Sequence, residues 1–260
     1  MTTLAASTGW RWVKDGFAVF AKQPMQLASL FLSYMLLMIL IGIIPLAGQV
    51  LPLILLPIFS LPFLRASALV RQGESVHPRL LFEGFRSPAR RVLLMLGGLQ
   101  LLAVILALGG SALVDGGLLW RILSGQVTLD AKVVAGSNLG LAMLTSAALY
   151  IPPSMAFWYA APLIAWQRMP LGKALFYSFF AVRREARAFL VYGVVWSAIG
   201  VILPSVVGLI VALLFNSGAF LMVVMFPLSL LLTVVAYCSF YATYADVFLP
   251  GAAPAPEPTA

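Results

Sequence analysis

The amino-acid sequence predicts an all-α membrane protein with six transmembrane helices, arranged as three helical hairpins of parallel topology. Hydrophobic residues make up 62% of the 260 residues and charged residues only 9%, whereas soluble domains carry about 25% charged residues. The mean hydropathy of +1.04 agrees with a membrane protein. The apolar runs are continuous and long enough to cross a bilayer, unlike the alternating segments of about ten residues in a membrane β-barrel.

The apolar runs place all six spans within one polytopic membrane domain, residues 1–249. Pro45 to Gly48 form a turn between the first two spans, and Asn216 to Gly218 form one between the last two. The second and fourth spans carry several prolines, so we expect them to be kinked or locally unwound. Residues 250–260 are rich in proline and alanine and are expected to form a disordered tail. The expected spans are approximately residues 26–44, 49–70, 92–113, 139–166, 188–215 and 219–246.

A basic and aromatic segment precedes each hairpin, at residues 14–22, 82–90 and 176–184. We expect each segment to form a cytoplasmic interfacial amphipathic helix. Around the first segment the apolar residues Trp10, Val13, Phe17 and Phe20 recur at spacings of three and four. The charged residues there lie largely on another face of the helix. Its tryptophans and lysines favour a helix lying in the headgroup layer; packing on the bundle as a soluble helix would is the alternative. In all three segments a phenylalanine stands five residues before a cation: Phe17 and Lys22, Phe85 and Arg90, Phe179 and Arg184.

The distribution of cations predicts the orientation. Six spans put both termini on the same side of the membrane. Of the 16 lysines and arginines, all except Arg121 and Lys132 then lie on that side. Because cytoplasmic loops carry an excess of lysine and arginine, both termini and the basic segments are expected to be cytoplasmic.

The three hairpins also predict an internal repeat. Each hairpin crosses the membrane twice, so the chain returns to the same face before the next basic segment. The repeats are therefore parallel and not inverted, and a pseudo-threefold axis along the membrane normal is the natural arrangement.

Several stretches resemble a known family. The run from Gly9 to Phe17, the proline at position 24, the helix ending Ile43-Ile44-Pro45 and the run from Leu80 to Arg86 are similar to an uncharacterised family of bacterial six-helix integral membrane proteins. They also look distantly like the membrane domain of some glycerophosphodiester phosphodiesterases. The resemblance extends to about Phe248. It implies a bacterial inner membrane and brings no catalytic residues.

The residues that enzymes and pumps require are sparse. With one histidine, His77, one cysteine, Cys238, and scattered acids, we expect no metal site, no cofactor and no enzymatic activity. The charge pattern is that of a membrane protein and predicts no nucleic-acid partner. No span has an ionisable residue near its centre, as a proton- or ion-driven pump would. Arg65 and Asp246 lie toward the ends of spans two and six, where pairing with each other or snorkelling is favoured over a gate.

The first functional hypothesis is a non-enzymatic inner-membrane protein that engages anionic lipid headgroups, or a membrane partner, through its cationic cytoplasmic segments. Each lysine or arginine near an anionic surface contributes about 1 kcal/mol of attraction. The same charges also serve to set topology, and both roles are compatible. A protein partner or homo-oligomer stays open. The candidate headgroup ligands are Lys14, Lys22, Arg86, Arg90, Arg91, Arg183, Arg184 and Arg187.

The alternative hypothesis is a transporter of a small neutral or amphipathic solute, with its path between spans two and four. Proline-broken helices offer unwound backbone and helix ends to a substrate, although proline is also common in membrane helices for packing reasons. The candidate path residues are Pro57, Ser60, Pro62, Tyr150, Pro152, Pro153, Ser154 and Tyr159.

Overall fold

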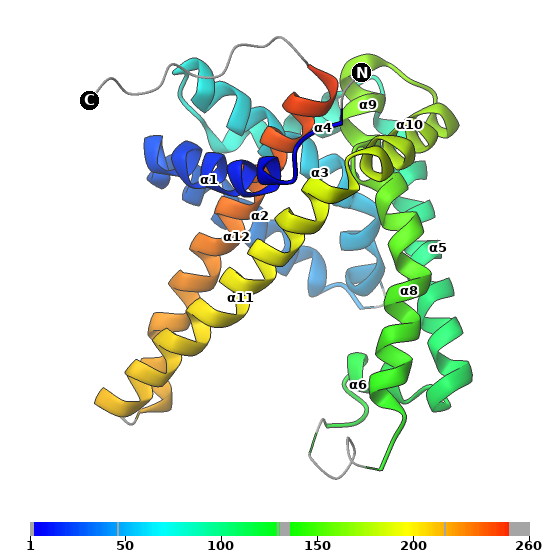
Figure 1. The fold of residues 1–260 in the computed structure, drawn as a ribbon, viewed down its shortest axis with the longest axis vertical. Helices are drawn as coiled ribbons and strands as arrows, with labels where there is room; N and C mark the ends of the chain where they lie inside the picture. The colour runs from blue at the N-terminus through cyan, green and yellow to red at the C-terminus, as the bar shows by residue number, and fades with distance from the viewer. Residues whose placement is uncertain (1–2, 46, 129, 131–135, 216, 250–260) are drawn as a thin grey trace. The chain divides into compact units, whose positions relative to one another are not determined.

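The fold was obtained as a computed structural model, which describes residues 3–45, 47–128, 130, 136–215 and 217–249. Within these residues the structure is helical and contains no strand, which confirms the all-α prediction (Figure 1). The expected tail, residues 250–260, and Lys132 lie outside the described residues. The elements are α1 (Ser7–Lys22), α2 (Pro24–Gly42), α3 (Ala47–Gln72), η1 (Pro78–Phe82), α4 (Glu83–Arg86), α5 (Arg90–Asp115), α6 (Leu118–Leu123), α8 (Leu139–Phe157), α9 (Ala160–Gln167), α10 (Leu171–Arg184), α11 (Ala186–Phe215) and α12 (Gly218–Phe248).

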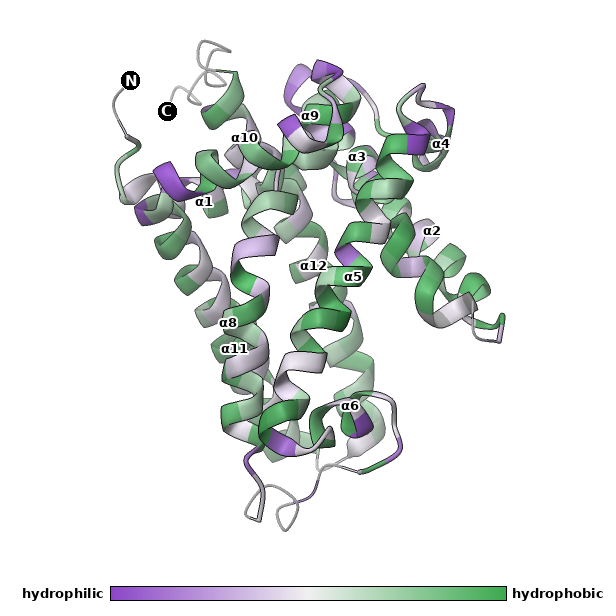
Figure 2. Cartoon of the chain, turned by 90° about the vertical axis from the view of Figure 1, so that its right-hand side faces the viewer, coloured by the Kyte–Doolittle hydropathy of each residue, from purple (hydrophilic) through white to green (hydrophobic). Residues whose placement is uncertain are grey.

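Six helical segments in the described part of the chain are long and apolar enough to cross a bilayer, so the prediction of six spans is confirmed at this level. Most of their residues are hydrophobic, and hydrophilic residues gather on α1, α4 and α6 (Figure 2). Hydrocarbon offers no hydrogen-bond partners, and a helix is suited to it because its backbone N–H and carbonyl groups bond to each other. The segments are Pro24–Gly42, Val50–Gln72, Arg90–Asp115, Leu139–Gln167, Ala186–Phe215 and Gly218–Phe248.

The two proline-rich spans behave differently. α3 continues without interruption through Pro52, Pro57 and Pro62, as the helix expected there; of the two expected effects of its prolines, local unwinding does not occur and a kink stays a prediction. The fourth span is interrupted: α8 ends at Phe157, and α9 begins at Ala160. Pro152 and Pro153 lie inside α8, so the interruption falls after these prolines.

The chain divides into two compact units, which are described separately. Unit 1 contains residues 1–40, 59–86 and 184–260, and unit 2 contains residues 41–58 and 87–183. In unit 1, α11 packs on α12, and α1 runs across both (Figure 1). In unit 2, α5 packs along α8, with α6 and α9 against them. The single-domain organisation, the three-hairpin repeat and its threefold axis stay predictions.

The three basic and aromatic segments do not have equal structures. The first and third lie on helices of four turns or nearly so, α1 and α10. The second forms a 3-10 helix, η1, followed by the four-residue α4. Phe85 of this segment packs edge-on against Phe59, with ring centroids 5.3 Å apart. A continuous amphipathic helix is therefore not what precedes α5.

Candidate membrane-interface site

One face of α1 is bound to the protein and the other is exposed. The buried face consists of small and apolar residues, among them Trp12, which has no exposed surface, and Val13. Trp10 and Phe17 are exposed by 48% and 38%. Of the apolar residues that recur at spacings of three and four in this helix, Val13 is therefore covered by the protein, whereas Trp10 and Phe17 are not.

Asp246 near the end of α12 joins α1 to the last span. Its carboxylate accepts a hydrogen bond from the Trp12 indole N–H at 2.7 Å and forms an ion pair with Arg11 at 2.6 Å. The ring of Trp12 also contacts Phe189 and Tyr192 of α11. The partner of Asp246 is thus Arg11, so of the two alternatives expected for Arg65 and Asp246, snorkelling or pairing with each other, the pairing is not found.

The second half of α1 is held by the end of α3 and the segment that follows. Arg71 pairs with Asp15 at 3.4 Å and lies over the ring of Tyr241. Gln23, the residue after α1, donates to the carbonyl of Glu74 at 2.8 Å and accepts from the N–H of Val76 at 3.1 Å. These contacts make α1 an integral part of unit 1.

Two glycines let α1 approach the spans at backbone distance. A Cβ built on Gly9 would collide with the carbonyl oxygen of Ala188 on α11. A Cβ on Gly16 would lie 2.8 Å from the carbonyl oxygen of Val235 and 2.6 Å from Cβ of Ser239 on α12. Ser239 also shares a hydrogen bond of 2.7 Å with the hydroxyl of Tyr192, which joins α11 to α12 beneath α1.

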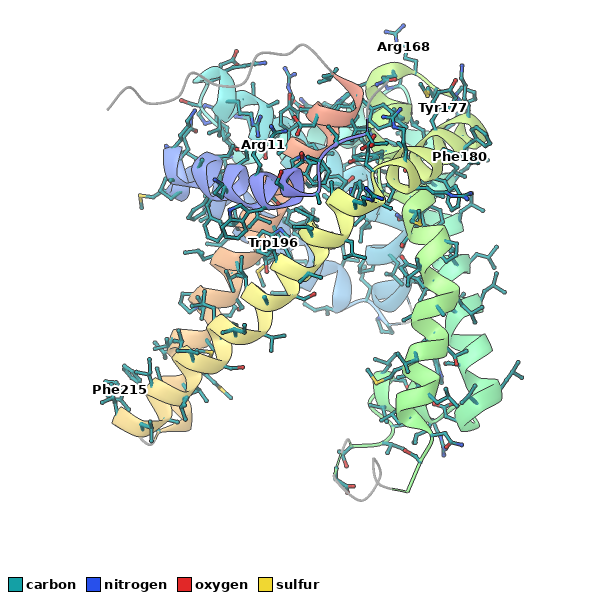
Figure 3. All side chains as sticks on the ribbon, viewed as in Figure 1. Arg11, Arg168, Tyr177, Phe180, Trp196 and Phe215 are labelled. Atoms are coloured by element: carbon teal, nitrogen blue, oxygen red, sulfur yellow. The ribbon has the colours of Figure 1, made fainter. Side chains whose placement is uncertain are left out.

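The exposed side of α1 is divided between charge and aromatic rings. Phe17 stacks on Trp196, ten residues along α11, with ring centroids 6.2 Å apart and planes inclined by 12°. Figure 3 shows Arg11 and Trp196 on opposite sides of α1. The aromatic edge therefore faces along the span and the Arg11 edge faces away from it, which is the arrangement of an interfacial helix.

The outer face of α10 carries the largest exposed aromatic cluster of unit 2. Phe176, Tyr177 and Phe180 are exposed by 59%, 46% and 45%, and Phe176 and Phe180 contact each other with centroids 4.5 Å apart. Lys173 lies 5.6 Å from the centre of the Tyr177 ring, and the exposed Arg183 ends the same face. Figure 3 shows Tyr177 and Phe180 on this helix. Cations flanking exposed rings are typical of a helix at a membrane surface.

The predicted headgroup ligands are all exposed. Arg184 pairs with Glu185 at 2.6 Å, and the Glu185 side chain is only 1% exposed. The other carboxylate oxygen of Glu185 accepts a hydrogen bond from the backbone N–H of Leu4 at 2.6 Å. This bond holds the N-terminal segment against the start of α11. For the other ligands no ion pair is present among the described residues: Lys14, Lys22, Arg86, Arg90, Arg91, Arg183 and Arg187.

The predicted transport-path residues are mostly protein-packed or on helix surfaces. Pro57 and Pro62 are buried in α3, and Ser60 is half-buried. On α8, Tyr150 and Pro153 are half-buried and Pro152 is exposed, while the Ser154 hydroxyl bonds the carbonyl of Ile151 in its own helix.

The interruption between α8 and α9 is filled by a side chain of α10. Tyr159, which is fully buried, donates its N–H to the hydroxyl of Ser178 at 2.9 Å. The Ser178 hydroxyl in turn donates to the carbonyl of Met155 at 2.8 Å. Backbone groups at the break therefore already have partners in the protein.

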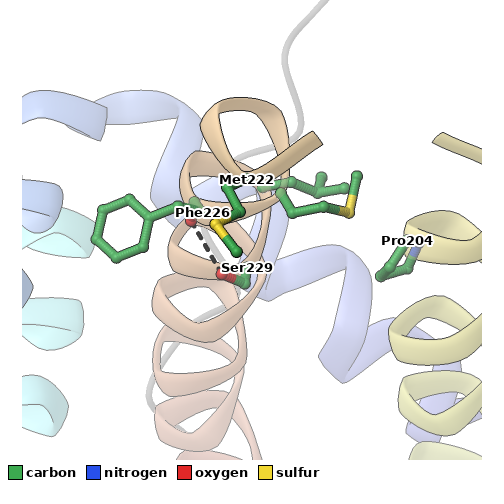
Figure 4. A pocket seen from close by; sticks show the side chains of 6 residues that line it. Pro204, Met222, Phe226 and Ser229 are labelled. Atoms are coloured by element: carbon green, nitrogen blue, oxygen red, sulfur yellow. Dashed lines mark hydrogen bonds between the residues drawn. The ribbon is translucent and has the colours of Figure 1, made fainter. Parts of the chain in front are cut away.

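A groove of about 430 Å³ lies between α11 and α12 (Figure 4). Methionine and other apolar side chains dominate its walls, and its one hydroxyl, that of Ser229, already donates to the carbonyl of Phe226. The groove has no charged residue and no reactive group. Its lining residues are Pro204, Met222, Met225, Phe226, Leu228 and Ser229.

Across the residues that the structure describes, no three His, Cys, Asp or Glu side chains lie close enough to hold a metal ion. Cys238 is buried, as expected from its apolar surroundings.

Six apolar helices with basic and aromatic helix faces define a multi-pass α-helical membrane protein. Over 251 residues the chain is 37% identical to a probable inner membrane protein of Burkholderia thailandensis, a match that covers 94% of this chain and 92% of the relative. The chain therefore belongs to this family of bacterial inner membrane proteins, as its sequence resemblance suggested. No family model matches the chain, and no solved structure does.

Proposed function

We propose that this inner membrane protein is non-enzymatic and that its exposed cations engage anionic lipid headgroups on the cytoplasmic side. The α1 face, defined by Trp10, Lys14, Phe17 and Lys22, and the α10 face, defined by Lys173, Phe176, Tyr177, Phe180 and Arg183, are the principal contact surfaces. Both termini share that side. A membrane protein partner with an acidic surface is the other occupant that these charges suit.

One observation carries the proposal: exposed cations without a carboxylate partner stand on the same helix faces as exposed aromatic rings. Arg11, Arg71 and Arg184 differ, because each already has an acidic partner in the protein. The carboxylates near the helix ends are thus used for assembly, and Lys14 and Arg183 are left to act on something outside the chain.

Physical chemistry favours a lipid as that partner. Tryptophan and tyrosine rings, such as those of Trp10 and Tyr177, prefer the headgroup layer, because one end of the side chain is apolar and the other end hydrogen-bonds to water. Cations beside them lie where lipid phosphates lie, and each contributes about 1 kcal/mol at an anionic surface. Neutralising one cation is therefore expected to weaken lipid binding, which raises the dissociation constant by up to about fivefold.

The transport hypothesis has less support. A broken helix points to a substrate site when its backbone groups await a ligand. Here Ser178 already satisfies the N–H of Tyr159 and the carbonyl of Met155. α3 has no break among the residues described for it. Transport therefore stays the alternative, with no observation of its own.

Native mass spectrometry of delipidated protein tests the proposal, with dioctanoyl phosphatidylglycerol and dioctanoyl phosphatidylcholine as probes. We expect the wild type to bind the anionic phosphatidylglycerol more tightly than the zwitterionic phosphatidylcholine. The double variants Lys14→Gln/Lys22→Gln and Lys173→Gln/Arg183→Gln should each lose most of that preference. Glutamine removes the charge and keeps an unbranched polar side chain that is somewhat shorter, and Arg121→Gln on the exposed surface of α6 is the control.

Equal binding of the two lipids by the wild type would contradict the proposal. So would an unchanged preference in both double variants. A loss of equal size in Arg121→Gln would mean that the preference follows total charge and not these two helix faces.

A further inference from the structure

The short helix α6 lies at the end of α5 that is farthest from Arg90 and Arg91. α5 has 26 residues, so it is about 39 Å long and exceeds the hydrocarbon thickness of about 30 Å. Its charged residues are Arg90 and Arg91 at the start and Asp115 at the end, and residues 92–114 carry no charge. α6 begins at Leu118 and packs against α5 and α8 (Figure 1). A bilayer that α5 crosses therefore has α6 at the surface opposite to Arg90 and Arg91.

The carboxylate of Asp115 fixes the turn between α5 and α6. One of its oxygens accepts a hydrogen bond from the N–H of Gly117 at 2.8 Å, and the other accepts one from the N–H of Leu119 at 2.7 Å. Gly116 and Gly117 both have positive φ, 65° and 85°, which glycine adopts without steric cost. The N–H of Gly116 bonds the carbonyl of Ala112 at 2.9 Å. α6 therefore has a defined place beside the end of α5.

The faces of α6 differ in character. Leu119 is buried against the protein, whereas Trp120 and Leu123 are exposed by 53% and 64%. Trp120 is the most exposed of the six tryptophans. Arg121 is also exposed, but at about 100° per residue its side chain lies about 160° around the helix from Leu123. Trp120 and Leu123 therefore form one apolar face, and the cation lies on another.

An exposed apolar stripe on α5 reaches the level of α6. Leu99, Leu102, Leu106 and Leu113 are exposed and follow each other at spacings of three, four and seven, which keeps them on one side of the helix. The last of them, Leu113, is 90% exposed and lies five residues before Leu118. The surface of α5 that suits hydrocarbon thus extends to the start of α6.

We propose that α6 inserts Trp120 and Leu123 into the lipid leaflet opposite to the one at Arg90 and Arg91. The partner of this face is the bilayer itself, at the boundary between headgroups and hydrocarbon. Leaving both side chains in water is unfavourable, and an indole is suited to this boundary because its ring is apolar and its N–H bonds to water. Arg121 stays on the aqueous side, as in other helices that lie in the interface.

This contact differs in chemistry from the one proposed for the α1 and α10 faces. Those faces act through cations and are expected to prefer anionic lipid, whereas the α6 face acts through apolar insertion. Its contact with the bilayer is therefore independent of headgroup charge. α6 holds unit 2 at a second membrane surface, and this role stands whether or not the cationic faces bind anionic lipid.

Electron paramagnetic resonance of spin labels tests the proposal. In a Cys238→Ser background, Trp120→Cys, Leu123→Cys and the control Arg121→Cys each carry one nitroxide, on full-length protein in phosphatidylcholine nanodiscs. Power saturation measures how often the label collides with oxygen, which concentrates in hydrocarbon, and with a water-soluble nickel chelate. We expect the ratio of oxygen to nickel collisions to be severalfold higher at positions 120 and 123 than at 121. The same difference is expected in phosphatidylglycerol nanodiscs.

Tryptophan fluorescence gives a measurement that needs no label. The difference in emission between the wild type and Trp120→Phe isolates the contribution of Trp120. We expect brominated phosphatidylcholine to quench this component strongly and aqueous iodide to quench it little. Because the wild type keeps its own side chain at position 120, this result does not depend on how a nitroxide is tolerated there.

Three results would overturn the proposal. Equal collision ratios at positions 120, 121 and 123, with iodide quenching of Trp120, would place the α6 face in water. Few collisions with either reagent at positions 120 and 123 would mean that protein, such as a second copy of the chain, covers this face. A difference that appears only in phosphatidylglycerol would make headgroup charge the determinant of the contact. Loss of the lipid preference in native mass spectrometry would contradict the proposed function and leave these collision ratios unchanged.

Discussion

The indole N–H of Trp12 donates to the carboxylate of Asp246 over a donor-to-acceptor distance of 2.7 Å, which joins the first helix to the last across 234 positions of sequence. Trp12 is fully buried, so its N–H has no access to solvent. A buried donor that loses its acceptor keeps the full cost of desolvation. This bond therefore fixes α1 on α12 and not merely near it.

A double-mutant cycle between Trp12→Phe and Asp246→Ala measures that bond. We expect a coupling energy of about 1.5 to 3 kcal/mol, as for hydrogen bonds to charged groups. Equilibrium unfolding in mixed micelles gives the free energies. Arg11→Ala is the comparison: its side chain is 55% exposed, so its ion pair with Asp246 should contribute little. A coupling near zero for the tryptophan would contradict the structural role assigned to Asp246.

The glycines of α1 give a second prediction, about helix crossing. Gly9→Ala and Gly16→Ala should each lower the unfolding midpoint, because the added methyl group meets the backbone of α11 or α12. Gly193→Ala on α11 is the matched control, since a Cβ there meets nothing within 4 Å. Alanine in an open helical position stabilises by about 0.5 to 1 kcal/mol, so the control should rise or stay level. Equal effects at Gly9 and Gly193 would argue against a close crossing.

These glycines also explain why the sequence pattern predicted the six spans but not the packing of α1. Run length and the scarcity of charge were enough to predict six spans, because both follow from the thickness of the bilayer. The sequence pattern did not indicate which face of α1 packs on the protein, because close approach depends on Gly9 and Gly16, and glycine adds almost nothing to a hydrophobic stripe.

The candidate site was predicted to a similar extent. The predicted headgroup ligands could be named from the distribution of charge along the sequence, and all of them are exposed. Which of them are already neutralised could not be predicted, because Arg11, Arg71 and Arg184 find acids through tertiary contacts. Glu185 was missed because its partner is a backbone N–H, that of Leu4, 181 residues away.

Ser178 gives a third prediction, on the break between α8 and α9. Ser178→Ala should destabilise the protein by about 1 to 3 kcal/mol, because the buried N–H of Tyr159 loses its acceptor. Ser154→Ala is the control, since that hydroxyl only bonds a carbonyl of its own helix and should change stability little. Both are compared by thermal unfolding in one detergent. Similar midpoints for the two variants would mean that the break is held by other contacts.

Glu185 gives a fourth prediction, on the N-terminal segment. Glu185→Ala removes the acceptor of the Leu4 N–H, so amide hydrogen exchange at Leu4 should accelerate by tenfold or more while exchange in the centre of α12 stays unchanged. Glu83→Ala, at an exposed position of α4, is the control. Protection at Leu4 that survives in Glu185→Ala would show that the carboxylate does not hold this segment.

The fifth prediction concerns orientation in the membrane. In a Cys238→Ser background, Arg183→Cys and Arg121→Cys each provide one exposed thiol for an impermeant maleimide. The predicted topology puts all but two of the 16 cations on the side of Arg183, so by the positive-inside rule we expect that side to face the cytoplasm. We expect intact spheroplasts to label Arg121→Cys, and Arg183→Cys to be labelled only after lysis. The reverse pattern would contradict the orientation and, with it, the contact of the α1 and α10 faces with cytoplasmic headgroups.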